Sequence, residues 1–310
     1  MIHLDLGGRL GNQFFRYAFA RQIDIKRGGN DDLILTTSRY GKQIDDSFTN
    51  GLSNFNVKPF STTNISIYHK LKKIIKIKYK IICVLKKIFK INSIVFERII
   101  FKHLSNDGLL IAYHDNYKFK APSTKDVFID GDFQSPEYFH QIKDILKKEF
   151  TPKLQPLEKN NELYYIIKNS NSVCIHVRRG DYLSEKYKKD FYVCDENYYK
   201  EAIRILEKFI TDPVFIFFSN DIGWVKDNLV TNRETYYEPS DIPLWESFRM
   251  MYCCKHFVIS NSTLSWWAQY LSDHQDKLVI SPDHWFNNPE KEKANNLILP
   301  DFTTIKCKYH

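Results

Sequence analysis

Two adjacent arginines follow a short apolar run, in the segment HVRRGDY at residues 176–182. The guanidinium groups of Arg178 and Arg179 are permanently charged planar forks whose N–H donors match the oxygens of a phosphate. Two more polar clusters follow apolar runs further along the chain, FSND at 218–221 and NSTLSWW at 261–267. All three clusters therefore have the composition of an anion or nucleotide site.

The remaining polar residues of these clusters suit a nucleoside diphosphate. Ser262 and Thr263 begin a predicted helix, where hydroxyls and free N–H groups bind anions. Asp221, at the end of a predicted strand, can accept from the N1–H and exocyclic amine of a purine, which favours guanine. Taken singly, Arg-Gly-Asp can be a turn with an ion pair, and Asn-Ser-Thr can be a helix cap. The convergence of three clusters argues against that alternative for all of them at once.

Alternating strands and helices have to position these clusters. They follow residues 151–156, which contain two prolines and are predicted to be a linker. The predicted strands are 172–177, 214–218, 257–260 and 277–281, and the predicted helices are 197–210, 224–229 and 263–272. This alternation predicts a parallel sheet with helices on both faces, in which ligands bind beyond the carboxyl ends of the strands. The three clusters are therefore expected to face one crevice.

A glycine-rich segment, GGRLGNQ at 7–13, stands between a predicted strand at 1–6 and a predicted helix at 14–27. Such a turn lets backbone N–H groups approach a phosphate or a carbonyl closely, although most glycine-rich turns only reverse the chain. Residues 31–70 are polar and show no periodicity, and we predict irregular structure there.

The net charge of +8 is concentrated in one part of the chain. Residues 47–96 contain ten lysines and no acidic residue, so the remainder carries about −2. Within this part, 71–90 has apolar residues at helical spacing with most lysines opposite, although Lys78 stands among the apolar ones. The pattern is typical of a helix on an anionic membrane surface. A surface helix with a solvated lysine face, or a strand at 75–81, also fits it.

Composition excludes several classes. A chain of 310 residues with 43% apolar residues is globular and long enough for two domains. Its six cysteines include no C-x-x-C pair, so we predict reduced thiols and neither a disulfide framework nor a zinc site. No long uncharged apolar run and no secretory signal are visible. The lysine-rich part contains no arginine and no nucleic-acid-binding motif, so no nucleic-acid partner is expected.

Four motifs occur together and in a fixed order: GGRLGNQ followed by FxxYA, then HVRRGDY, FSND and NSTLSWW. In this combination the chain resembles the α1,2-fucosyltransferases (glycosyltransferase family 11, bacterial type). It is more distantly similar to protein O-fucosyltransferases and α1,6-fucosyltransferases. The matches run from residue 7 to about residue 271.

The resemblance implies an α/β, GT-B-like fold of two Rossmann-like domains. Residues 1–150 would form an N-terminal acceptor-side domain, and 151–310 a C-terminal GDP-fucose-binding domain. It also implies inverting transfer of L-fucose from GDP-β-L-fucose to the 2-hydroxyl of a galactose, in O-antigen or other surface polysaccharide synthesis. The expected partners are GDP-fucose and a galactose-terminated oligosaccharide or lipid-linked glycan. The expected location is cytoplasmic, with peripheral contact between 71–90 and the inner membrane face as an additional prediction.

The same resemblance implies roles for individual residues. Arg178 is expected to stabilise the departing β-phosphate, and His176 and Asp181 to orient the arginine and the donor. The further donor-binding residues implied are Arg179, Ser219, Asn220, Asp221, Asn261, Ser262, Thr263 and Ser265, and the residues implied at the donor phosphates or acceptor are Gly11, Asn12 and Gln13. The chain departs from the family pattern at Arg16, where a glutamine is usual, and at Gln269, where a small residue is usual. The change at Arg16 bears on acceptor preference.

No cofactor and no metal are expected. The nearest D-x-D sequence is DGD at 130–132, which lies outside the three clusters and is interpreted as a loop or an acceptor-side feature. We predict that Arg178 and the helix start at Ser262 replace a metal electrostatically. The general base is not identified: the acids near the arginines or across the expected cleft are Asp132, Asp181, Glu185 and Asp190.

Three alternatives remain open at this point. A transferase of the same architecture could make an α1,3 or α1,6 linkage. A non-catalytic glycan or nucleotide-sugar binder would more often have lost Arg178 or the NST cluster, and both are present. A membrane or nucleic-acid binder would depend on 71–90 alone, so deleting that segment separates it from a transferase.

Overall fold

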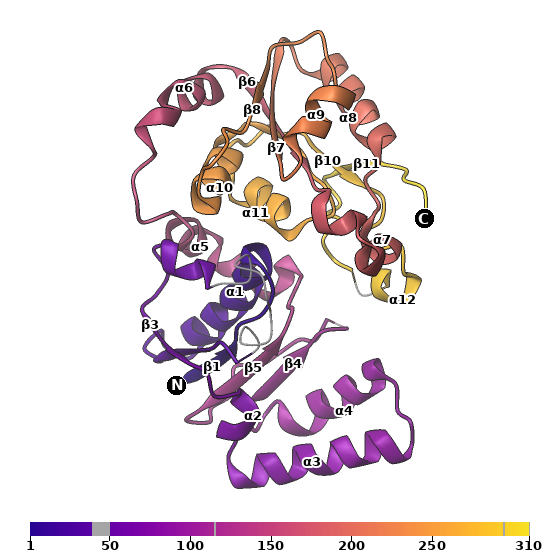
Figure 1. The fold of residues 1–310 in the computed structure, drawn as a ribbon. Coiled ribbons are helices and arrows are strands. Elements are labelled where there is room, and N and C mark those ends of the chain that lie inside the picture. The colour runs from indigo at the N-terminus through magenta and orange to yellow at the C-terminus, as the bar shows by residue number, and fades with distance from the viewer. Residues whose placement is uncertain (39–49, 115, 294, 310) are drawn as a thin grey trace. The chain divides into compact units, whose positions relative to one another are not determined.

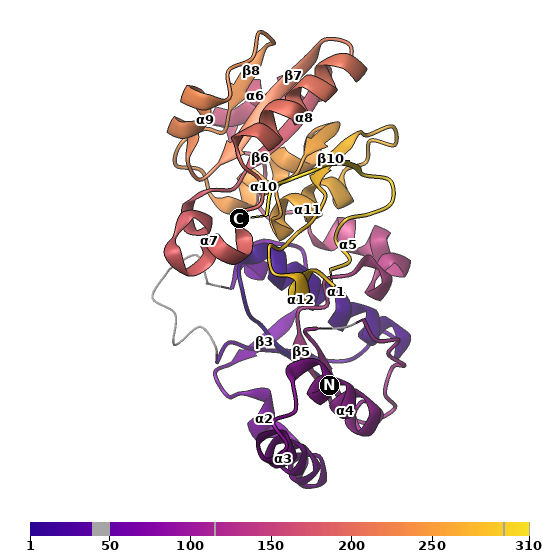
Figure 2. The ribbon, with the colours of Figure 1, turned by 90° about the vertical axis from the view of Figure 1, so that its right-hand side faces the viewer.

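A computed structural model describes residues 1–38, 50–114, 116–293 and 295–309. Contacts divide the chain into two compact units, Met1–Phe150 (unit 1) and Thr151–His310 (unit 2). Each unit consists of one sheet covered by helices (Figures 1 and 2). Both sheets are parallel at every strand pair. The predicted α/β class is therefore confirmed, and the sequence-based division after residue 150 coincides with the division between the units.

Unit 1 contains a five-stranded sheet in the order β3-β2-β1-β5-β4. Its strands are β1 (Ile2–Asp5), β2 (Leu33–Thr36), β3 (Phe60–Thr63), β4 (Leu109–Ala112) and β5 (Val127–Gly131). The strands β2 and β3 lie on one side of β1, and β5 and β4 lie on the other. The order in which strands are added to the sheet therefore reverses between β1 and β5. This junction is the place where a parallel sheet opens a ligand crevice at its carboxyl edge.

The helices of unit 1 cover both faces of this sheet. They are α1 (Leu10–Lys26), α2 (Ile67–Lys70), α3 (Lys73–Ile88), α4 (Ser93–Leu104) and α5 (Lys143–Glu149), with 3-10 turns η3 (Gly51–Asn54), η4 (Pro136–Tyr138) and η5 (His140–Ile142). The α1 helix is buried along most of its length; Phe14 and Phe19 stack on other rings of unit 1, and Phe15 forms a tilted pair with Phe139. These aromatic contacts anchor the helix that follows the glycine-rich turn.

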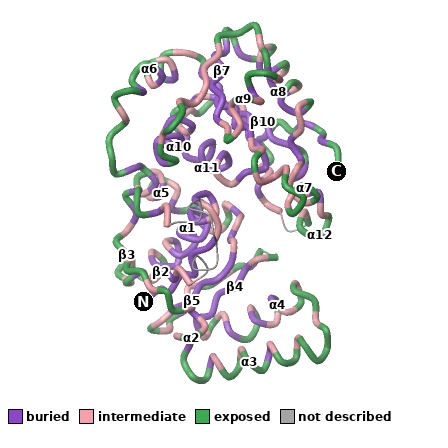
Figure 3. The backbone as a smooth tube through the Cα atoms, viewed as in Figure 1, coloured by how far each residue is buried: buried purple, intermediate pink, exposed green. Residues whose placement is uncertain are grey.

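The other face of the sheet carries a smaller apolar cluster. It joins Ile75 and Ile82 of α3 and Ile100 of α4 to Phe128 of β5, among others. Figures 1 and 2 show α3 and α4 side by side, with α3 at the outer edge of unit 1. Figure 3 shows that most of α3 is exposed.

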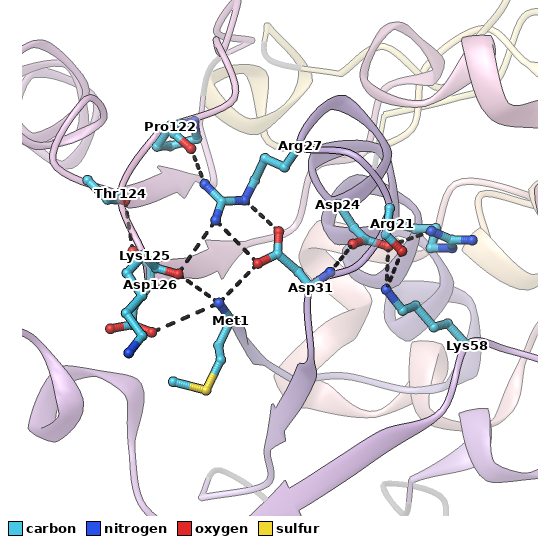
Figure 4. Close-up of polar contacts among 11 residues, drawn as sticks. Met1, Arg21, Asp24, Arg27, Asp31, Lys58, Pro122, Thr124, Lys125 and Asp126 are labelled. Atoms are coloured by element: carbon cyan, nitrogen blue, oxygen red, sulfur yellow. Dashed lines mark hydrogen bonds and ion pairs between the residues drawn. The ribbon is translucent and has the colours of Figure 1, made fainter.

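Charged groups pair with one another where the strands of unit 1 begin (Figure 4). The amino group of Met1 donates to Asp31 at 3.0 Å and to the carbonyl of Lys125 at 2.7 Å. Arg27 forms an ion pair with the same Asp31 at 2.6 Å. These contacts tie the starts of β1, β2 and β5 together, at the end of the sheet opposite the expected ligand crevice. These contacts stabilise unit 1 at the amino ends of its strands, away from the carboxyl edge where a ligand is expected to bind.

Unit 2 contains a six-stranded sheet in the order β11-β10-β9-β6-β7-β8. Its strands are β6 (Asn171–Val177), β7 (Pro213–Ser219), β8 (Thr235–Tyr237), β9 (His256–Val258), β10 (Val279–Pro282) and β11 (Thr303–Ile305). Numbered within the unit, the order reads 3-2-1-4-5-6, which is that of a dinucleotide-binding Rossmann fold. The order in which strands are added reverses between β6 and β9.

Helices flank both sides of this sheet. They are α6 (Asn161–Asn169), α7 (Glu185–Phe191), α8 (Glu196–Phe209), α9 (Ile222–Asn228), α10 (Leu244–Cys253), α11 (Thr263–Leu271) and α12 (Pro289–Glu292), with 3-10 turns η6 (Glu158–Asn160) and η7 (Gly180–Leu183). One face of β6, carrying Val173 and Ile175, packs on Tyr198 and Leu206 of α8. Figure 1 shows α10 and α11 on the opposite side of the strands from α8.

The structure confirms most of the elements predicted for unit 2, within two or three residues at their ends, and corrects several in unit 1. The region 31–70 was predicted to be irregular, but it contains β2, η3, β3 and α2. The helix after the glycine-rich turn begins at Leu10 rather than at Phe14. The segment 71–90 forms α3, so the strand alternative is wrong. All six cysteines are free thiols, as predicted.

Candidate functional site

The carboxyl ends of the neighbouring strands β6 and β9 lie at the point where the strand order of unit 2 reverses. His176, the penultimate residue of β6, is buried, and its Nδ1 lies 2.8 Å from the hydroxyl oxygen of Ser260, which follows β9. Ser260 is itself fully buried. This contact fixes the spacing of the two strand ends that carry HVRRGDY and NSTLSWW, and so confirms that these two clusters converge.

Burial determines the charge of this histidine. It lowers the pKa of His176 to about 4, so the imidazole is neutral at pH 7. A neutral ring held by Ser260 can orient neighbouring groups, but it does not supply an imidazolium charge to a phosphate. The geometry therefore makes His176 a positioning residue.

Arg178 lies just past the end of β6 and is partly exposed. Its Nη2 donates to Asp181 Oδ1 at 2.6 Å, and its guanidinium lies 5.5 Å from the centre of the Tyr182 ring. The hydroxyl of Tyr182 donates to the carbonyl of Asn261 at 3.2 Å, on the other side of the strand junction. Asp181 and Tyr182 thus both contact the arginine, whose side chain is 20% exposed. Tyr182 is thus a site residue that the sequence alone did not indicate.

Arg179 turns towards the second cluster. Its Nε donates to Asp221 Oδ2 at 3.0 Å, and its guanidinium lies 3.7 Å from the centre of the Trp224 ring. The other carboxylate oxygen of Asp221 accepts from the N–H of Trp224 and caps α9. Asp221 is 40% exposed, so a guanine contact is sterically available, but both of its oxygens already accept a hydrogen bond. The FSND cluster therefore converges with the arginines, as predicted.

A glycine explains the tight contact between these two clusters. Gly180 has φ +25°, and a Cβ atom there would lie 1.9 Å from Nδ2 of Asn220. Asn220 Oδ1 in turn accepts from the N–H of Arg179 at 3.1 Å. Glycine is therefore favoured at position 180, because a Cβ atom there would displace the side chain of Asn220, which follows β7.

Ser219 and Glu238 complete the same edge of the sheet. The Ser219 hydroxyl accepts from the N–H of Asp221 at 2.9 Å, and the Ser219 N–H donates to Glu238 at 3.2 Å. Burial raises the pKa of Glu238, which follows β8. Glu238 is not apparent from the sequence, because the three-residue strand that precedes it is too short to be predicted.

The start of α11 presents uncapped backbone donors. Ser262 is the N-cap residue, its side chain makes no capping hydrogen bond, and the first turn contains no acidic residue. Ser265 is fully buried and donates to the carbonyls of Ser262 and Ser260, so it supports the turn from within. Thr263 is only partly buried. The first turn of this nine-residue helix can therefore receive an anion.

Asn261 has a mainly structural position. Its Nδ2 donates to the carbonyls of Phe191 and Trp285, each at 2.9 Å. Both side-chain amide hydrogens of Asn261 are therefore used within the protein. Of this amide group, only the oxygen remains to contact the sugar-nucleotide donor. Gln269, the departure from the family pattern in α11, is also buried.

The predicted residues of unit 1 lie in the first turn of α1. Gln13 is fully buried: its Nε2 donates to the carbonyl of Gly8 at 3.0 Å, and its Oε1 accepts from the N–H of Gly51 at 2.9 Å. Asn12 accepts from Gln134 at 3.1 Å and is partly exposed. Gly11 is buried. Both ends of the Gln13 amide are therefore engaged in fixing the turn, and the contact with the donor phosphates or the acceptor stays a prediction.

Arg16 lies at the junction of β1 and β5, surrounded by three carboxylates. Its Nη2 donates to Asp132 at 2.8 Å, and its Nη1 lies 3.6 Å from Asp130 and 3.9 Å from Asp5. Burial lowers the pKa of Arg16, but these carboxylates outweigh the effect and hold the pKa above its usual value. The DGD sequence is not a loop as one interpretation had it, because Asp130 and Gly131 end β5. Its carboxylates face an arginine.

A cavity of about 570 Å³ opens at the carboxyl ends of β1, β2 and β3. Asp5, the last residue of β1, lines this cavity, and the other lining residues are Ser38, Asn64, Ile65, Ser66, Tyr68 and His69. The Tyr68 hydroxyl donates to Asp130 at 2.6 Å, which connects the cavity wall to the acids around Arg16. The sequence gives no sign of this cavity, because its lining residues other than Asp5 come from a region predicted to be irregular.

The acids named as base candidates differ in their surroundings. Asp190 forms an ion pair with Lys291 at 2.5 Å, and Asp181 holds Arg178. Asp132 is 40% exposed beside Arg16, and Glu185 begins α7. In the part of the chain that the structure describes, no three acidic, histidine or cysteine side chains are grouped as metal ligands. Nor is any described helix long and apolar enough to cross a membrane.

Comparison with known proteins gives relatives along the whole chain. The chain is 29% identical over 307 residues to the O-antigen biosynthesis glycosyltransferase WbnK of Escherichia coli, covering 93% of this chain and 96% of that protein. It is 33% identical over 174 residues to an Escherichia coli alpha-1,2-colitosyltransferase, covering 54% of this chain and 57% of that protein. Human galactoside alpha-(1,2)-fucosyltransferase 1 is 26% identical over 186 residues, covering 55% of this chain and 50% of that protein.

Solved structures share the fold. The crystal structure of NodZ alpha-1,6-fucosyltransferase soaked with GDP-fucose superposes with a TM-score of 0.50 at 12% identity, covering 91% of this chain and 94% of that one. NodZ from Bradyrhizobium also appears in a second structure with a TM-score of 0.50 and 10% identity, covering 86% and 91%. At these identities the likeness establishes the GT-B-type fold alone, and it confirms the predicted one.

The family follows from the sequence as a whole. The model of glycosyl transferase family 11 matches residues 1–306. This range includes the glycine-rich turn, both arginines and the start of α11, so the transferase prediction and the resemblance to this family are both confirmed. The chain belongs to glycosyl transferase family 11.

Proposed function

We propose that the chain is an inverting galactoside α1,2-fucosyltransferase. It moves L-fucose from GDP-β-L-fucose to the 2-hydroxyl of a galactose in O-antigen or another surface polysaccharide. The relatives support the transferase class and the α1,2 linkage, since two of those named above carry it in their names. The observation that carries the proposal is the position of Arg178 and the α11 start on either side of the β6–β9 junction.

The proposed reaction is a single displacement. The galactose 2-hydroxyl attacks the anomeric carbon of fucose from the face opposite the nucleotide, and the bond to the β-phosphate oxygen breaks. GDP leaves with the bonding electrons, and the hydroxyl proton passes to a base that we do not assign. The greatest demand on the protein is therefore charge that develops on the leaving phosphate.

Arg178 and the first turn of α11 meet that demand in our proposal. The guanidinium offers a fixed positive charge, and the uncapped N–H groups of α11 add a partial one. Asp181 holds the arginine at 2.6 Å, so little reorganisation is needed when the charge develops. We propose that these groups do the electrostatic work which other transferases assign to a divalent metal, and that the enzyme uses no cofactor.

The guanosine part is assigned to the second cluster. Asp221, Asn220 and Ser219 line the carboxyl end of β7, next to Arg179 stacked on Trp224. We propose that Asp221 accepts from guanine with its remaining lone pairs and that Arg179 moves towards a phosphate when the donor binds. The hydrogen bond between Arg179 and Asp221 would then break when the donor binds.

The acceptor is assigned to the cavity of unit 1. Its carboxylate, amide and hydroxyl groups match the hydroxyls of a sugar, and Tyr68 offers a ring for the apolar face of galactose. We propose that Asp5 and Asn64 bind the galactose. An acceptor carried on a lipid would place the reaction at a membrane surface.

A colitose donor is a second candidate, favoured by the 33% identity to the alpha-1,2-colitosyltransferase. Colitose is fucose without its 3-hydroxyl. A site that hydrogen-bonds this hydroxyl rejects the deoxy sugar strongly, whereas a site with an apolar wall there discriminates weakly.

The test uses the purified chain with lactose and N-acetyllactosamine as acceptors. GDP-fucose and GDP-colitose are offered separately, and the product linkage is determined by NMR. We expect an α1,2-linked product and a higher kcat/KM with GDP-fucose. A higher kcat/KM with GDP-colitose would assign the other donor, and an α1,3 or α1,6 product would overturn the linkage. GDP binding without turnover of either donor would leave a nucleotide-sugar binder.

A further inference from the structure

The helix α3 presents three different faces along its length. Ile75 and Ile82 are buried in the apolar cluster with α4 and β4. A second face carries exposed apolar residues three or four positions apart, which we call the apolar stripe. They are Ile74, Ile77, Ile81, Val84 and Ile88, each between 48% and 65% exposed. The amphipathic pattern of the sequence placed several of these residues on one apolar face together with Ile75 and Ile82, and the structure separates the exposed residues from the buried ones.

The apolar stripe is not required for packing within unit 1. The core contacts of α3 are made by Ile75, Ile82 and the partly buried Tyr79, and the ammonium of Lys86 adds a cation–π contact 4.3 Å from the centre of the Phe96 ring. At 1.5 Å per residue, the stripe extends for about 21 Å along the outer surface of the unit. A continuous exposed apolar strip of this kind is a docking surface rather than ordinary surface variation.

Lysines border the apolar stripe on one side. Lys73, Lys76, Lys80 and Lys87 share a third face of α3 and, among the described residues, none of them forms an ion pair. On the other side lies Lys78, which pairs with Asp107 at 2.7 Å. The sequence from 47 to 96 contains no acidic residue, so no acid of this segment balances the lysines. The stripe therefore lies in a strongly positive field.

This combination identifies the chemistry of the partner. An apolar stripe alone fits a second copy of the chain, but such a contact would bring two sets of lysines to the rim of one interface. Like charges at that distance oppose association. An anionic lipid surface satisfies both features at once, because acyl chains receive the isoleucines and headgroups receive the lysines.

We propose that α3 docks unit 1 on an anionic membrane surface. The helix lies in the plane of the interface, with the apolar stripe towards the acyl chains and the four lysines at the phosphate level. It does not span the bilayer, since its sixteen residues are too few and too rich in lysine. The proposal concerns location and is independent of which sugar the enzyme transfers.

The test is co-sedimentation of the full chain with vesicles. Phosphatidylcholine vesicles with and without phosphatidylglycerol are compared at low ionic strength and at roughly 0.15 M salt. We expect binding to the anionic vesicles only, weakened but not abolished by salt. Replacing the four lysines with glutamine should weaken binding about fivefold for each residue removed.

A second variant tests the apolar stripe itself. Ile77→Asn, Ile81→Asn and Val84→Asn together change only exposed side chains and should reduce binding by at least about tenfold. The matched control replaces three exposed apolar residues of unit 2, Tyr165→Asn, Phe209→Asn and Val230→Asn, and should bind as the wild type does. Circular dichroism of each variant confirms that it is folded.

Three outcomes would overturn the proposal. One is failure of the wild type to bind anionic vesicles at low ionic strength. Another is equal loss of binding in the stripe variant and in the unit 2 control. The third is a wild-type dimer in light scattering that the stripe variant loses while no vesicle binding occurs, because the stripe would then belong to a second copy of the chain.

Discussion

The imidazole Nδ1 of His176 lies 2.8 Å from the hydroxyl oxygen of Ser260, across the junction of β6 and β9. This single contact joins the two strand ends from which the arginine pair and the start of α11 emerge. Both partners are buried, so the spacing is protected from solvent. A positioning role for His176 predicts effects on stability and donor geometry rather than on a titrating catalytic step.

The buried histidine makes stability depend on pH. Its pKa is about 4 when folded and 6.5 in the reference state, so below pH 6.5 the unfolded chain binds a proton that the folded chain does not. Stability contributed by the neutral ring is therefore complete above pH 6.5 and is lost as the pH falls towards 4. The loss reaches as much as about 3 kcal/mol.

The measurement is urea unfolding at pH 7 and pH 5, followed by tryptophan fluorescence. All five tryptophans lie in unit 2, so the signal reports the unit that contains His176. His176→Asn should show a smaller decrease in stability between the two pH values than the wild type. His256, whose pKa burial also lowers to about 4, contributes equally to both proteins. An unchanged decrease in the variant would contradict the account of His176.

Gly180→Ala should weaken GDP binding. The added methyl would lie 1.9 Å from Asn220 Nδ2 and would adopt an unfavourable φ of +25°, so Asn220 and Arg179 must move. We expect roughly a tenfold or larger increase in the Kd for GDP by titration calorimetry, corresponding to about 1.4 kcal/mol. Asn220→Gly in the same chain should recover part of the loss.

Gly223→Ala is the matched control for this substitution. Gly223 lies in α9, and a Cβ atom there meets nothing within 4 Å. Alanine should therefore leave GDP affinity unchanged and stabilise the helix by about 0.5–1 kcal/mol. Equal loss of affinity in the two variants would mean that the steric account of Gly180 is wrong.

Arg16→Gln should destabilise unit 1 by about 3–5 kcal/mol. The change leaves Asp5, Asp130 and Asp132 together without their buried cation, because glutamine is neutral and shorter than arginine. Thermal unfolding followed by circular dichroism measures the effect. Adding Asp132→Asn should recover part of the stability because it removes one of the repelling charges. A variant as stable as the wild type would show that these carboxylates do not need the arginine.

The sequence was most informative where its periodicity was strong. The buried strand 171–177 and the amphipathic helix 196–209 were predicted almost to the residue, and they define the Rossmann-like unit. The convergence of the three polar clusters also followed from topology, because the carboxyl ends of parallel strands share one edge.

Unit 1 was much less predictable, for a physical reason. Strands of four residues such as β2 and β3 are too short to show a period; β2 is held by pairing with β1, and β3 by pairing with β2. Because these strands could not be predicted, neither the cavity nor the carboxylates around Arg16 could be predicted. The orientation of side chains around a helix was also beyond sequence, since α3 divides its apolar residues between the core and the apolar stripe.

The central claim is that Arg178 stabilises the departing phosphate without a metal, and its most direct test is fucose transfer in EDTA. Wild type, Arg178→Ala and the control Arg204→Ala are compared with GDP-fucose and lactose; Arg204 pairs with Glu201 on the surface of α8. We predict that wild type and control keep full turnover in the chelator, while Arg178→Ala loses at least about a hundredfold in kcat. Wild-type turnover that collapses in EDTA and returns with manganese, or an Arg178→Ala enzyme that stays within a few fold of wild type, would contradict the claim.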